Sequence, residues 1–161
     1  MTGCEGLISS RPGRDLLDNV LCMNLQLTDS RVAVNLQSTP LHLGLGCRSR
    51  PVEGFTFEPA ALDAYAAAVA DDGNEGRLVV LIDEQGRGNH WERHPAGDEV
   101  IVCVSGTITV IREIGDGTEQ VTLGPGEATV NPAGVWHAVD ADGDARILTI
   151  TPGLGTEHRM R

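Results

Sequence analysis

From residue 78 onward the chain is a series of short apolar runs of β type, divided by glycine, proline and aspartate. Residues 115–117 (Gly-Asp-Gly) are typical of a hairpin turn, and residues 124–126 (Gly-Pro-Gly) of a tight corner. Many short strands with turn residues between them predict an all-β fold, a sandwich or small β-barrel of the jelly-roll type. The eight expected strands are residues 78–82, 89–94, 99–104, 107–114, 120–123, 128–131, 135–139 and 146–151.

One short helix is expected before these strands, beginning at Pro59, which suits a first helical turn. Its apolar positions at helical spacing are Leu62, Tyr65, Ala66 and Val69. The first fifty residues keep neither a helical nor a strand period for long. We therefore expect a loose N-terminal arm at residues 1–50, followed by one domain at residues 51–161.

The composition excludes several classes of partner. The chain has 23 acidic residues against 12 basic ones, all arginine, and a formal net charge of −11, which disfavours nucleic acid and anionic membrane surfaces. No apolar run approaches the roughly 20 residues of a membrane span, and the N-terminus lacks the basic start of a secretory leader. Cys4, Cys22, Cys47 and Cys103 form no CxxC pair, which indicates free thiols and a cytoplasmic protein.

Both faces of the run at residues 99–104 are apolar apart from one carboxylate. Side chains alternate along a strand, so Val100, Val102 and Val104 lie on the face opposite Glu99. A strand in a barrel wall normally has one face exposed to solvent. We therefore expect this second face to be covered by a second copy of the chain, in a homodimer, rather than by packing within the chain.

Titratable side chains gather in and just after the run at residues 89–94. In an extended strand His90, Glu92 and His94 project to one face, and Glu99 approaches His94 across the turn at residues 95–98. Imidazole and carboxylate groups inside a barrel are costly unless they are paired or bind a cation. This mixture of nitrogen and oxygen donors suits Fe, Mn, Ni, Co or Zn better than a thiolate metal.

Two segments of the sequence resemble the two motifs of the cupin superfamily. In the first, His94 is followed after four residues by Glu99 and after six more by Gly106. Residues 91–99 (WERHPAGDE) further resemble a group of small, single-domain bacterial cupins, and the whole resemblance covers about residues 76–152. The second motif is matched by Gly126, Pro132, Gly134 and His137.

The resemblance implies a jelly-roll barrel that holds one divalent transition metal ion. It assigns His94, Glu99 and His137 as ligands, whereas Glu92 stands where the family usually has its first histidine. Glu92 is therefore a fourth ligand, an acid or base beside the metal, or a residue without a direct role; His90 is the other residue able to complete the shell.

Three functions follow from the resemblance. The first is a metal-dependent enzyme that acts on a small polar substrate as a Lewis acid or by activating dioxygen: a dioxygenase, a sugar isomerase or epimerase, or a decarboxylase. The second is a non-catalytic protein that binds a metal or a sugar. The third is a metal-free structural protein.

The residues around the motifs carry their own expectations. Trp91 and Trp136 neighbour the candidate ligands, and strand alternation turns them away from the cavity, so they are expected to pack rather than to bind substrate. Cys103 is expected to be a small buried apolar residue. His42 and His158 lie in poorly patterned segments and are expected to be solvated.

Overall fold

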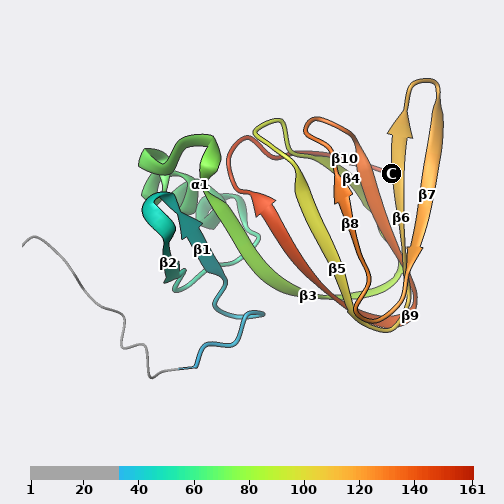
Figure 1. The fold of residues 1–161 in the computed structure, drawn as a ribbon, viewed down its shortest axis with the longest axis horizontal. Helices are drawn as coiled ribbons and strands as arrows, with labels where there is room; N and C mark the ends of the chain where they lie inside the picture. The colour runs from blue at the N-terminus through green and yellow to red at the C-terminus, as the bar shows by residue number, and fades with distance from the viewer. Residues whose placement is uncertain (1–32) are drawn as a thin grey trace, which may run out of the picture. The chain divides into compact units, whose positions relative to one another are not determined.

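The computed structural model describes residues 33–161, and they form an antiparallel β structure with one short α-helix (Figure 1). The all-β prediction is confirmed. No helix within residues 33–161 is long and apolar enough to cross a membrane. The elements are β1 (Leu41–Gly44), the 3-10 turn η1 (Leu45–Cys47), β2 (Arg48–Pro51), α1 (Pro59–Ala68), the 3-10 turn η2 (Ala70–Glu75), β3 (Arg77–Arg87), β4 (His90–Arg93), β5 (Glu99–Ser105), β6 (Ile108–Ile114), β7 (Gly117–Leu123), β8 (Ala128–Asn131), β9 (His137–Pro152) and β10 (Glu157–Met160).

Strand β9 organises the fold, because it pairs with β3, β4, β5 and β6 (Figure 1). The sequence predicted two strands here, at residues 135–139 and 146–151, with a polar break between them. The structure joins them into a single strand of 16 residues. The polar stretch stays extended because it pairs with β3. Within it Asp144 lies opposite Gln85 and accepts a hydrogen bond from the side-chain amide of Gln85.

The core lies between the sheet faces and is made of alternate residues from the central strands. Its centre includes Ile101 and Cys103 from β5, each almost fully buried, so Cys103 behaves as the small apolar residue expected. The same alternation that buries Ile101 and Cys103 turns Glu99 inward at the start of β5. The other members are Ile108, Val110, Leu123, Ala145 and Ile147.

The helix expected from Pro59 is present, and it buries Tyr65 and the following Val69 against Leu78 of β3.

His42 was expected to be solvated, and that expectation is wrong: its side chain is 2% exposed. Its Nδ1 lies 2.9 Å from the Tyr65 hydroxyl and its Nε2 lies 2.8 Å from Asp72 Oδ2. A histidine that satisfies both ring nitrogens in this way is stable when buried.

Residues 41–50, which the sequence assigned to a poorly patterned arm, form β1 and most of β2. Strand β1 pairs with β3, placing Leu41 opposite Val79. Both strands have four residues, and β2 is polar apart from Pro51. Strand β2 pairs with β1, which in turn pairs with β3, so both become strands through their partners rather than through an apolar pattern of their own. Residues 1–32 of the expected arm lie outside the described residues, and the division of the chain into an arm and a domain stays a prediction.

Candidate metal centre

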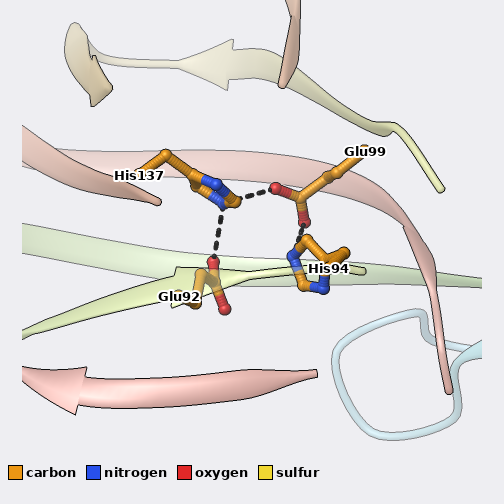
Figure 2. A group of neighbouring side chains, drawn as sticks. All are labelled: Glu92, His94, Glu99 and His137. Atoms are coloured by element: carbon orange, nitrogen blue, oxygen red, sulfur yellow. Dashed lines mark ion pairs between the residues drawn. The ribbon is translucent and has the colours of Figure 1, made fainter. Parts of the chain in front are cut away.

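Four side chains converge in the structure (Figure 2). Glu92 comes from β4, His94 from the residue after β4, Glu99 from the start of β5 and His137 from the start of β9. Each offers one nitrogen or oxygen atom, and these atoms all lie within 4.8 Å of one another. The structure therefore brings together the four residues that the sequence singled out.

The local chain path explains this convergence. Glu92 and His94 are two residues apart, so they share a face, and Glu92 lies directly opposite His137 in the pairing of β4 with β9. The carbonyl of His94 accepts hydrogen bonds from the backbone N–H groups of Gly97 and Gly134, at 3.4 and 3.1 Å. Through this shared carbonyl, the turn before Glu99 and the loop before His137 are held next to each other.

The two imidazoles are oriented in the way that metal coordination requires. His94 Nδ1 lies 2.9 Å from the Thr156 hydroxyl, and His137 Nδ1 donates to the Val135 carbonyl at 3.1 Å. Within the described chain, neither Nε2 atom has a hydrogen-bond partner, although both are buried. Metal-binding histidines use one ring nitrogen for a protein partner and the other for the ion, so this arrangement fits a cation.

Two carboxylates face these nitrogens. His137 Nε2 lies 2.8 Å from Glu99 Oε2 and 3.4 Å from Glu92 Oε1, and His94 Nε2 lies 3.4 Å from Glu99 Oε1. His94, Glu99 and His137 are at most 3% exposed, whereas a quarter of the Glu92 side chain is exposed. Glu92 is thus the most solvent-exposed member of the group.

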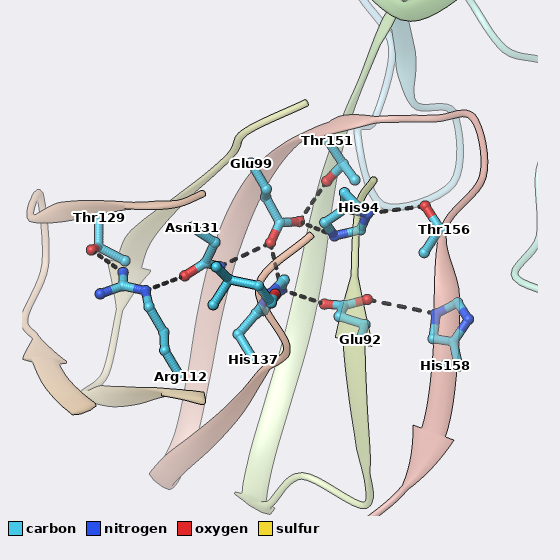
Figure 3. Close-up of polar contacts among 11 residues, drawn as sticks. Glu92, His94, Glu99, Arg112, Thr129, Asn131, His137, Thr151, Thr156 and His158 are labelled. Atoms are coloured by element: carbon cyan, nitrogen blue, oxygen red, sulfur yellow. Dashed lines mark hydrogen bonds and ion pairs between the residues drawn. The ribbon is translucent and has the colours of Figure 1, made fainter. Parts of the chain in front are cut away.

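Glu99 is held by a second layer of polar side chains that sequence reasoning missed (Figure 3). Thr151 donates to Glu99 Oε1 at 2.6 Å, and Asn131 donates to Oε2 at 3.1 Å. Arg112 in turn donates to Asn131 Oδ1 at 2.7 Å. The signal was present, because Asn131 is a polar residue closing an apolar run, but only the pairing of Glu99 with Asn131 reveals its target.

Burial and ion pairing act in opposite directions on the charges of this group. Burial alone raises the pKa of Glu99, but its contacts with His137 and His94 outweigh that effect and lower the pKa to about 2. In the same way, contacts with His137 and His158 outweigh burial and lower the pKa of Glu92. Burial lowers the pKa of His137, but Glu92 and Glu99 reverse this and raise it to about 9. Without metal, the group is an ion-paired cluster that carries a proton on His137.

This charge pattern predicts how the stability of the metal-free protein depends on pH. The folded-state pKa of His137 lies above its ordinary value of 6.5, so its stabilising effect is complete below pH 6.5 and is lost as pH rises through about 9. We expect the free energy of unfolding to fall by roughly 2 to 3 kcal/mol across that range. Urea unfolding in the presence of a chelator, at pH 6 and pH 9, measures it.

A matched titration with one equivalent of Zn²⁺ gives the control, because a metal ion needs His137 neutral and binding then strengthens with pH. The free energy of unfolding of the zinc-loaded protein should therefore rise with pH, opposite to that of the metal-free protein. Metal-free protein that becomes more stable between pH 6 and pH 9 would contradict the charge assignment.

The remaining histidines lie outside this group. His90 is exposed, and its Nδ1 lies 2.7 Å from Asn89 Oδ1. His158 was expected to be solvated; its side chain is 48% exposed, but its Nε2 lies 3.6 Å from Glu92 Oε2 (Figure 3). This contact could not be predicted from the sequence, because it depends on the pairing of β10 with β4, which places His158 opposite Glu92.

Trp91 and Trp136 are covered by arginine side chains. The guanidinium of Arg159 lies 4.5 Å from the centre of the Trp136 ring and 5.6 Å from that of Trp91. Arg93 lies 4.8 Å from the centre of the Trp136 ring and bonds to Glu157 on β10. Trp91 and Arg93 alternate with Glu92 along β4, so these stacked groups occupy the opposite face of the sheet from the His and Glu cluster.

Comparison with known proteins identifies the fold. Residues 78–151 match the family model described as Cupin domain. A cupin-2 domain protein from Shewanella frigidimarina is 29% identical over 47% of this chain and 70% of its own, with a TM-score of 0.39. A cupin superfamily protein from Desulfitobacterium hafniense is 21% identical over 47% of this chain and 66% of its own, with a TM-score of 0.42. No curated protein matches the chain.

Two enzymes of known structure are more distant neighbours. Hydroquinone 1,2-dioxygenase from Sphingomonas, solved with 4-hydroxybenzoate bound, is 16% identical over 47% of this chain and 58% of its own, with a TM-score of 0.41. Hydroxypropylphosphonic acid epoxidase from S. wedmorenis, in complex with fosfomycin, is 18% identical over 47% of this chain and 43% of its own, with a TM-score of 0.42. The matched region spans less than two thirds of either enzyme.

The fold and the convergent side chains define a β-barrel protein with a buried cluster of two histidines and two glutamates able to hold a metal ion. Residues 78–151 are a cupin domain.

Proposed function

We propose that the protein binds one divalent transition metal ion through Glu92, His94, Glu99 and His137 and uses it on a small polar substrate. The observation that carries this proposal is the convergence of the buried Nε2 atoms of His94 and His137 on the carboxylate of Glu99, at 3.4 and 2.8 Å. Within residues 33–161 neither Nε2 atom makes a hydrogen bond, and a bound cation would satisfy both nitrogens and the carboxylate together.

The donor set fits Fe, Mn, Ni, Co or Zn, because it combines two imidazole nitrogens with carboxylate oxygens. The two carboxylates also neutralise the charge of a divalent ion. Once bound, such an ion supplies Lewis acidity to a substrate oxygen or, as iron(II), the ability to activate dioxygen.

The protein's own residues then decide how substrate and protons move. Because Glu92 is the most exposed member, a substrate that reaches the group must pass it. Contacts with His137 and His158 lower the pKa of Glu92, so its carboxylate is ionised and can take a proton from a bound substrate only when those contacts loosen. Its other carboxylate oxygen faces His158 at the surface, so the proton has a route to solvent.

The first experiment is elemental mass spectrometry of full-length protein, purified without chelator or His-tag and then desalted. We expect about one tightly held transition metal ion per chain. Iron directs the activity screen to oxygen consumption with catechols, thiols and diketones. Manganese, zinc, nickel or cobalt directs it to sugar isomerisation and decarboxylation. A site that stays empty after added metal overturns the proposal and favours the structural alternative.

The Glu92→Gln variant separates the two roles of Glu92. If Glu92 is a ligand, the variant loses at least about tenfold in metal affinity. If it is only an acid or base, the variant keeps the ion and loses turnover. Glu157→Gln is the matched control, because Glu157 lies opposite Arg93 rather than in the cluster, and it should change neither property. A metal-loaded protein without turnover in any screen favours the non-catalytic binding alternative.

We also propose a homodimer through the outer face of β5 and β8. Val100 lies opposite Val130 there, and Val130 and Val104 are 52% and 45% exposed. An apolar face of this kind is stabilised by burial against a second copy. Sedimentation velocity should show a dimer that Val130→Glu dissociates, whereas Ile114→Glu, at another exposed apolar residue, should not. A monomeric wild-type protein would contradict the proposed dimer.

The cytoplasmic location expected from the free thiols stays part of the proposal.

A further inference from the structure

A second cluster of metal-ligating side chains lies beside the first, toward solvent. His90 and Glu92 are two residues apart on β4, so they share a face of the sheet. Strand β10 pairs antiparallel with β4 and places His158 directly opposite Glu92 and Met160 opposite His90. Two strands therefore bring three donor side chains to one place.

The distances within this cluster suit a shared ligand. His158 Nε2 lies 3.6 Å from Glu92 Oε2, and the ring centres of His90 and His158 are 5.6 Å apart. One ligand atom from each of the three side chains lies within 4.8 Å of the others. The contact of His90 Nδ1 with Asn89 leaves the other ring nitrogen of His90 for an ion.

Glu92 joins this outer cluster to the inner one. Its Oε1 faces His137 and its Oε2 faces His158, so the two carboxylate oxygens point to opposite sides (Figure 3). A carboxylate in this position can bridge two metal ions about 3.5 to 4 Å apart. Arg93 and Arg159, the arginines of β4 and β10, do not compete for Oε2, because they stack on tryptophans of the other face.

We propose that His90, Glu92 and His158 form a second, outer site for a divalent transition metal ion, bridged by Glu92 to the inner ion. This explains why glutamate stands at position 92, since a histidine there could not serve two ions through two oxygens. The outer site shares Glu92 with the proposed function but needs no assumption about the reaction. It is open to solvent, so its ion is bound more weakly and exchanges on desalting.

Titration of metal-free, full-length protein with Co²⁺ tests the outer site, followed by calorimetry and by the visible absorption of bound cobalt. We expect two ions per chain, one tight and one weak. His90→Ala and His158→Ala should each weaken the second binding step at least tenfold and leave the first unchanged. Both residues are exposed, so circular dichroism should confirm that these variants stay folded. Glu157→Gln, on the same strand as His158, should still bind two ions.

The outcomes separate the two proposals. A protein that binds one ion, with an affinity unaffected by His90→Ala and His158→Ala, overturns the outer site and leaves the proposed function standing. A protein that binds no ion overturns both. Magnetic coupling between two bound Co²⁺ ions, measured by electron paramagnetic resonance, is expected if Glu92 bridges them, and two uncoupled ions would overturn the bridge.

Discussion

Replacing both His94 and His137 with alanine is expected to remove the tightly held metal ion. The two Nε2 atoms are the nitrogen donors of the inner cluster, and their removal leaves only the carboxylates of Glu92 and Glu99 there. Binding energies of structural zinc sites correspond to about 3 kcal/mol per ligand, so losing two ligands should weaken binding on the order of ten thousandfold. Metal content after desalting measures the loss directly.

The fold should survive this change, because Thr151 and Asn131 still hold Glu99. Thr156→Val is a useful companion variant. It keeps both ligands but removes the hydroxyl that orients His94, so affinity should fall by only about 10- to 100-fold. If the double variant keeps its tight ion, these residues are not the ligands. If it fails to fold, Glu99→Gln tests the same site with an almost unchanged shape.

Gly106→Ala is expected to destabilise the protein severely. Gly106 follows β5 with φ +78, a conformation that residues with a side chain rarely adopt. A Cβ there would lie 2.5 Å from the carbonyl oxygen of Asp144 and 2.8 Å from Cα of Ala145, both backbone atoms of β9. Strain and collision together should lower the free energy of unfolding by about 3 to 5 kcal/mol.

Gly126→Ala separates the two causes. Gly126 has a similar φ of +86, but a Cβ there meets nothing within 4 Å. This variant should therefore lose only the strain contribution, about 1 to 2 kcal/mol. Urea unfolding of both variants in metal-free buffer provides the comparison. If both variants lose the same free energy of unfolding, β9 moves away from the new methyl group at little cost, and the close contact at Gly106 does not contribute.

The strands that the sequence located well are those whose signals are local. The runs at residues 99–104 and 128–131 correspond to β5 and β8, because each is apolar and ends at glycine or proline. Strand β9 was divided in two because its acidic middle looks like a turn. Strands β1, β2 and β10 were missed, since their short, largely polar sequences become strands only through a partner.

The same distinction applies to the site. The four inner residues were found because strand alternation and motif spacing act along the chain. Asn131 and Thr151 were missed because they reach Glu99 from other strands. His42 and His158 were assigned to solvent for the same reason: each gains its partners only when distant segments pair.

The central place of β9 has a consequence for when the protein becomes functional during synthesis. Val79 of β3 pairs with Ile150, 71 residues later in the chain. At about 5 to 20 residues per second, β3 waits roughly 4 to 14 s for this partner. His137 arrives with β9, so the four side chains of the inner group come together only after this strand has been made. The metal ion proposed for this group can therefore bind only late in synthesis, after the sheet around it has begun to close.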